Sequence, residues 1–95
     1  MREITDEKLE KYLKITKEAL DLAKEAHSSW RSAEVFDMAD RYYRDALHFK
    51  SKGDFVNAFA AVSYSHGWLD CGALLGLFNV KDNRLFTVDD EPHKD

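Results

Sequence analysis

Residues 55–78, FVNAFAAVSYSHGWLDCGALLGLF, contain a single formal charge, Asp70. At about 100° per residue, the apolar side chains of this segment occur at nearly every angle around a helix axis, with Val62 on one side and Trp68 on the other. A helix with only one buried stripe has a clear polar side, and this segment has none. The pattern therefore predicts a helix that is covered from more than one direction.

A short connection precedes this segment. Gly53 stands where a helix commonly ends on a residue with positive φ, and Asp54 is a favourable N-cap for the helix that starts at Phe55. Lys52-Gly53-Asp54-Phe55 thus predicts a tight helical hairpin.

Two amphipathic segments lie upstream of the hairpin. The first follows Thr5, a plausible N-cap, and carries apolar or small residues every three or four positions as far as Trp30. The second repeats this spacing from Phe36 to Phe49. Serines 28, 29 and 32 form a polar break between them, although Trp30 equally fits the end of the first helix. We expect helices over residues 5–29, 33–52 and 54–78.

Acidic residues precede basic residues by four positions on the predicted outer sides of these two helices. Such i,i+4 pairs support exposed helical faces. The pairs are Glu7 with Lys11, Glu10 with Lys14, Asp37 with Arg41, and Asp40 with Arg44.

The chain of 95 residues, 44% of them hydrophobic, is enough for one core. We predict a single all-α domain over residues 1–95, an antiparallel three-helix bundle. Residues 79–95 form a tail in which a turn signal precedes the β-prone stretch Leu85-Phe86-Thr87-Val88. This tail is expected to be short, extended and packed on the bundle.

Composition and charge argue against some classes of partner and of cellular location. The formal net charge of -4 at pH 7 disfavours nucleic acid, which is a polyanion. Cys71 is the single cysteine and cannot form an internal disulfide, and the first residues lack the pattern of a signal peptide, so a cytoplasmic protein is expected. Polar residues such as Asn57 and Ser65 interrupt the most apolar segment, which argues against a membrane span.

Three polar residues share one narrow sector of the third predicted helix: Ser63, His66 and Asp70. Their spacing suggests a hydrolytic triad, but no strained elbow or oxyanion loop accompanies them, so we predict no catalytic residues and a protein that is not an enzyme. His66 and Asp70 remain candidates for a small-ligand site. Two ligands are too few to hold a metal ion, and no metal or other cofactor is expected.

The sequence resembles a known family. The resemblance is carried by Arg41-Tyr42-Tyr43-Arg44-Asp45-Ala46-Leu47-His48-Phe49, Tyr64-Ser65-His66-Gly67-Trp68-Leu69-Asp70 and Leu85-Phe86-Thr87-Val88. These stretches are similar to those of an archaeal family of unknown function, DUF357, and the similarity extends over almost the whole chain. It implies a three-helix bundle and supplies no catalytic residues. The resemblance also implies that some relatives are joined to nucleotidyltransferase-like domains, which suggests an accessory or scaffolding role.

Two functions are compatible with these observations. The first is a non-catalytic interaction or scaffolding module that forms a homodimer or binds a protein partner through a second apolar face of the third helix. Its predicted interface residues are Tyr64, Trp68, Cys71, Leu75 and Phe78. The alternative is a nucleotide- or RNA-directed domain, because the spacing of Arg41 and His48 resembles that of HEPN domains. Arg44 would belong to the same site.

Overall fold

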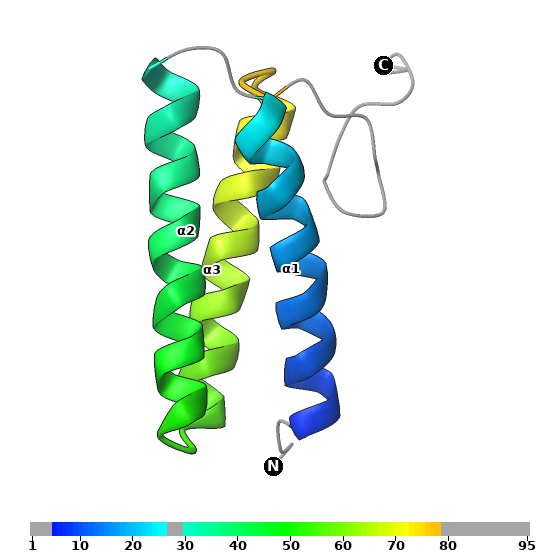
Figure 1. The fold of residues 1–95 in the computed structure, drawn as a ribbon, viewed down its shortest axis with the longest axis vertical. Coiled ribbons are helices and arrows are strands. Elements are labelled where there is room, and N and C mark those ends of the chain that lie inside the picture. The colour runs from blue at the N-terminus through cyan, green and yellow to red at the C-terminus, as the bar shows by residue number, and fades with distance from the viewer. Residues whose placement is uncertain (1–4, 27–29, 79–95) are drawn as a thin grey trace, which may run out of the picture.

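Three α-helices form the part of the chain that the computed structural model describes, residues 5–26 and 30–78. They are α1 (Asp6–Ala26), α2 (Trp30–Ser51) and α3 (Phe55–Leu74). The helices run up, down and up, and α3 lies behind α1 and α2 in Figure 1 and packs against both. The predicted all-α three-helix bundle is confirmed, whereas the predicted extended tail lies outside the described residues.

Helix α1 begins at the predicted cap. The backbone N–H of Lys8 donates to Oγ1 of Thr5 at 3.1 Å, which satisfies one of the free N–H groups of the first turn. From there its inward side chains follow the predicted spacing of three and four residues. Those that are buried are Leu9, Leu13, Thr16, Ala19, Leu20 and Ala23.

The core consists of two clusters, one toward each end of the bundle. Both clusters combine leucine or valine from α1 and α3 with alanines, and the ring of Tyr43 packs against both. One cluster contains Ala19, Leu20, Ala23, Ala39, Leu69 and Phe78. The other contains Leu9, Leu13, Ala46, Ala58, Ala61 and Val62.

The connection between α2 and α3 has the predicted geometry. Gly53 has φ of 75°, and its N–H donates to the carbonyl of Lys50 at 2.9 Å. The N–H of Asp54 donates to the carbonyl of Phe49 at 2.9 Å, which completes a Schellman motif. Asp54 then caps α3 by accepting a hydrogen bond from the N–H of Asn57 at 3.1 Å. Local sequence therefore defines this turn completely.

Helix α2 starts earlier than the predicted residue 33. It begins at Trp30, which is exposed, so this tryptophan belongs to the second helix rather than to the end of the first. Ser32 is fully buried in the first turn of α2 and does not mark the break. Residues 27–29 lie outside the described part of the chain.

Helix α3 ends at Leu74 rather than at the predicted residue 78. Gly76 has φ of 73°, its N–H donates to the carbonyl of Ala73 at 3.1 Å, and the N–H of Leu77 donates to the carbonyl of Gly72 at 2.8 Å. This is a second Schellman motif, in which Gly76 supplies the left-handed residue that stops the helix.

The turn at Gly76 sends Phe78 back onto α3. Phe78 is 2% exposed, and its ring lies over Gly72 so closely that an added Cβ atom would overlap Cε2 and lie 2.7 Å from Cδ2. A buried ring cannot swing away cheaply. Gly72 is therefore required by the packing of the monomer.

Replacement of Gly72 by alanine tests this contact. We expect Gly72→Ala to lower the free energy of unfolding by about 1–3 kcal/mol, because overpacking outweighs the better helix propensity of alanine. Urea denaturation measures the change. In a Phe78→Val background, where the ring is gone, the same substitution should be neutral or stabilising, and an equal loss in both backgrounds would contradict the contact.

Candidate functional site

One side of α3 faces away from α1 and α2, except at its edge, where the ring of Tyr64 meets that of Tyr42 on α2. We call it the outer face of α3. Its side chains are exposed. The structure describes every residue of α3, and no exposed side chain of this helix carries a formal charge. Val56, Tyr64 and Leu75, which follows directly as the C-cap, are exposed by 68%, 63% and 68%. The outer face consists of Val56, Asn57, Ala60, Ser63, Tyr64, Gly67, Cys71, Leu74 and Leu75.

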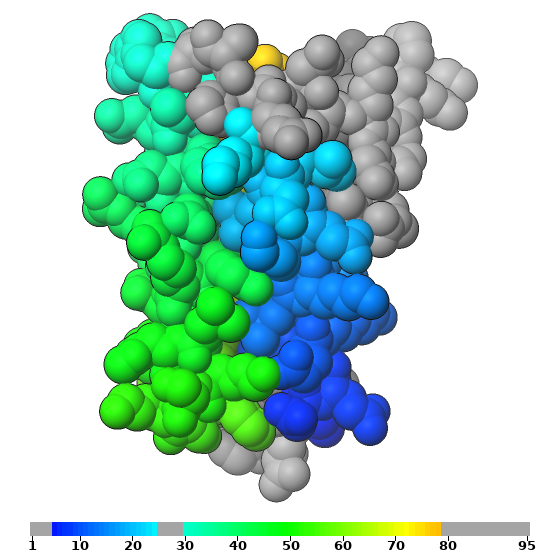
Figure 2. Space-filling model, viewed as in Figure 1, coloured from blue at the N-terminus to red at the C-terminus, as the bar shows by residue number. Residues whose placement is uncertain are grey.

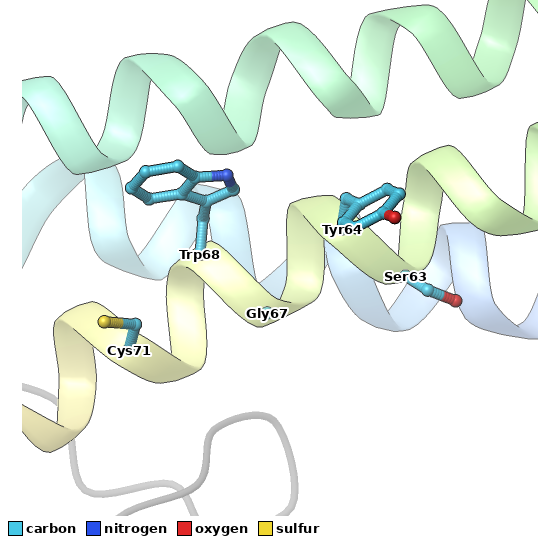
Figure 3. A pocket seen from close by; sticks show the side chains of 5 residues that line it. All are labelled: Ser63, Tyr64, Gly67, Trp68 and Cys71. Atoms are coloured by element: carbon cyan, nitrogen blue, oxygen red, sulfur yellow. The ribbon is translucent and has the colours of Figure 1, made fainter.

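A shallow depression of about 320 Å³ lies on this face, and Figure 3 shows the residues that line it. Tyr64 and Trp68 both project from α3 toward α2, and Gly67 lies on the ribbon between them. The ring of Tyr64 is 5.5 Å from that of Tyr42 on α2. Trp68 is half-buried and packs against the core cluster beneath it. Ser63 and Cys71 complete the lining.

The packing of the described residues does not require a glycine at position 67. Among residues 5–26 and 30–78, a Cβ atom added to Gly67 would meet no heavy atom within 4 Å, and the φ of Gly67 lies outside the left-handed region that favours glycine. A mid-helix glycine lowers stability by about 1 kcal/mol relative to alanine. Gly53 and Gly76 are explained by their turns and Gly72 by Phe78, so Gly67 alone lacks an explanation among the contacts of the described residues.

The five residues predicted for an interface do not all lie on the outer face. Tyr64, Cys71 and Leu75 are exposed on the outer face, and Trp68 presents only part of its ring. Phe78 does not belong with them, because the turn at Gly76 buries it in the core. The predicted interface did not include Val56, Ala60, Gly67 and Leu74, although their spacing of four and seven residues was available as a signal.

A polar contact joins α1 to α3 on the inner side. Nδ1 of His66 and Oγ1 of Thr16 are 3.2 Å apart, and Nε2 of His66 is 3.6 Å from Oδ1 of Asp70. Thr16 is fully buried, while His66 and Asp70 are each about one quarter exposed. Ser63, which the sequence grouped with them, is exposed and lines the depression instead.

This arrangement is unsuited to nucleophilic catalysis. The hydroxyl nearest to His66 belongs to Thr16, whose burial keeps substrate away from it. The contact orients the imidazole between two oxygen-bearing neighbours inside the bundle. His66 thus has a structural role at the contact between α1 and α3, and the small-ligand site at His66 and Asp70 stays a prediction.

Substitution of Thr16 tests that role. Thr16→Val keeps the shape of the side chain but leaves His66 Nδ1 without its partner, and we expect a loss of about 1–2 kcal/mol in the free energy of unfolding. Thr16→Ser keeps the hydroxyl and serves as the control. Chemical denaturation at neutral pH gives both values, and a Thr16→Val protein as stable as the parent would contradict the role.

The three residues of the nucleotide hypothesis share one side of α2. Arg41, Arg44 and His48 are all exposed there, as the spacing predicts. Both arginines form the predicted i,i+4 ion pairs: Nε of Arg41 lies 3.0 Å from Asp37 and Nη2 of Arg44 lies 2.7 Å from Asp40. Each positive charge thus has a carboxylate beside it, which reduces the attraction of this surface for phosphate.

A second hollow, of about 220 Å³, lies between α1 and α2. Figure 2 shows the side of the bundle on which these two helices meet. The ammonium of Lys17 lies 2.6 Å from Asp21, a hydrogen bond that raises the pKa of Lys17. Burial raises the pKa of the Tyr43 phenol. The hollow is lined by Lys17, Leu20, Asp21, Lys24, Phe36, Asp40, Tyr43 and Arg44, which carry charges of both signs.

Within residues 5–26 and 30–78, no three or more side chains of His, Cys, Asp or Glu come together as metal ligands. None of the helices α1, α2 and α3 is long and apolar enough to cross a membrane.

Comparison with known proteins gives one match. The profile of the family described as "Protein of unknown function (DUF357)" matches residues 11–78. The chain belongs to the DUF357 family. Comparisons with curated proteins and with solved structures give no match.

The DUF357 match extends over most of α1, all of α2 and α3, and the turn to Phe78. Both the outer face of α3 and the contact between Thr16 and His66 therefore lie inside the part of the chain that defines the DUF357 family.

Proposed function

We propose that this DUF357 protein is a non-catalytic interaction module that self-associates through the outer face of α3. The observation that carries the proposal is Gly67, a glycine that weakens its own helix although a Cβ atom there would meet no heavy atom within 4 Å among the described residues. A backbone from outside can approach a helix closely only where no Cβ atom projects. A second chain at this position would give Gly67 the role that the monomer does not.

The character of the outer face supports this proposal. Single exposed apolar side chains are ordinary, but a contiguous apolar surface without charges is typical of protein contacts. Tyr64 is well suited to such a contact because its ring supplies a large rigid area and a polar hydroxyl. Val56 and Leu75 extend the apolar surface toward the two ends of the helix.

We also propose a cytoplasmic location and a role without catalysis. The unpaired Cys71 is compatible with the cytoplasm, where thiols stay reduced. We assign no catalytic residue, since the hydroxyl that contacts His66 is enclosed in the bundle.

A charge on the outer face tests self-association. Gly67→Glu should leave the monomer folded, since the position is open and glutamate is the better helix former, but it should weaken association by about tenfold or more because it inserts an unpaired charge into the contact. Sedimentation equilibrium at micromolar concentration measures the change. Leu22→Glu is the matched control, because Leu22 is an exposed apolar residue on α1. A parent protein that is strictly monomeric would refute the proposal.

The nucleotide- or RNA-directed alternative rests on the shared exposed side of Arg41, Arg44 and His48. The ion pairs of both arginines count against it. We expect the double variant Arg41→Ala/His48→Ala to match the parent in titrations with a fluorescent single-stranded RNA and with ATP. Measurable binding by the parent that the double variant loses would favour the alternative instead.

A further inference from the structure

Resting on the proposed self-association, we propose that two copies pack α3 against α3 in antiparallel orientation, with the two-fold axis beside Gly67. Cys71 of one copy then faces Ser63 of the other, and Leu74 faces Ala60. The partner is thus a second copy of the chain in one defined register.

A single row of residues runs along the centre of the outer face. Ser63 and Cys71 lie four positions before and after Gly67, and Ala60 and Leu74 lie seven positions before and after it. Steps of three and four keep all five residues on one side of the helix. The row is therefore spaced symmetrically about the glycine, as a two-fold contact requires, because such a contact pairs a surface with itself.

Side-chain size favours the antiparallel orientation. About the axis at Gly67, the small Ala60 is opposite the large Leu74, so that one fills the space that the other leaves. In a parallel pair, Leu74 would meet Leu74 and Ala60 would meet Ala60, which crowds one end and leaves a void at the other. The antiparallel orientation also sets the two helix dipoles in opposite directions, which is the favourable arrangement.

The absence of charge on this face favours a second copy over a charged partner. A partner bearing a patch of either sign would find no opposite charge on the outer face of α3, whereas a second outer face is equally uncharged. A helix of 20 residues is about 30 Å long and ~10 Å wide with its side chains, which gives ~300 Å² per copy for α3 alone. That area is below the range of stable specific interfaces, so we expect a weak and reversible dimer rather than an obligate one.

Cysteine cross-linking tests the register, because Cys71 is the only cysteine of the chain. In the antiparallel dimer the two Cys71 residues are displaced along the axis by about 12 Å, eight residues of helical rise, which exceeds the Cα separation that a disulfide can bridge. Ser63→Cys places a thiol opposite Cys71 of the other copy. We expect mild oxidation to cross-link this variant quantitatively and the parent not at all.

The control variant is Ser63→Cys/Cys71→Ser, which keeps only the new thiol. Its two copies are also about 12 Å apart along the axis and should not cross-link. Non-reducing electrophoresis reports the covalent dimer, and sedimentation of the reduced proteins reports association independently.

The possible outcomes separate the register from the function. Cross-linking of the parent through Cys71 would show parallel packing and overturn the register while leaving self-association intact. A reduced dimer in which no variant cross-links would also overturn this register. A monomer with reactive Cys71 would overturn both the register and the proposed self-association. So would a monomer with Cys71 protected from alkylation, since a segment of the same chain, such as the one after residue 78, would then cover the face.

Discussion

Small side chains hold α2 and α3 close together, and the rest of the bundle depends on that contact. Ala39 and Ala46 of α2 are fully buried, as is Ala58 of α3, so the two backbones approach without bulky residues between them. The hydroxyl of Ser65 donates to the carbonyl of Ala39 at 2.6 Å in this buried region. Helix α1 then closes the core with leucines, and the side of α3 that remains uncovered becomes the outer face.

The hairpin could be predicted because its determinants are local, whereas the end of α3 could not. Gly53 and Asp54 act through hydrogen bonds to residues a few positions away. A glycine such as Gly76 can either permit close packing or end a helix, and only the position of Phe78 in three dimensions distinguishes the two. Similarly, Glu10 pairs with Lys50 of α2 rather than with Lys14, because another helix lies within its reach.

The candidate site, too, could be predicted only in part. Periodicity predicted that α3 has more apolar surface than a single contact can cover, and this conclusion holds for the outer face. It did not predict which residues form that face, since Phe78 turns inward and Trp68 is half-buried. The partner of His66 was missed because Thr16 is fifty residues away along the chain and meets it only through the packing of α1 on α3.

Because the bundle has three antiparallel helices, its first helix starts at one end and its last helix stops at the opposite end. The start of α1 and the end of α3 are thus separated by the length of a helix (Figure 1). Anything attached at these two points would be held about 30 Å apart. A pulling force between them would make the helices slide along one another, so that their contacts bear the load in shear and give way together.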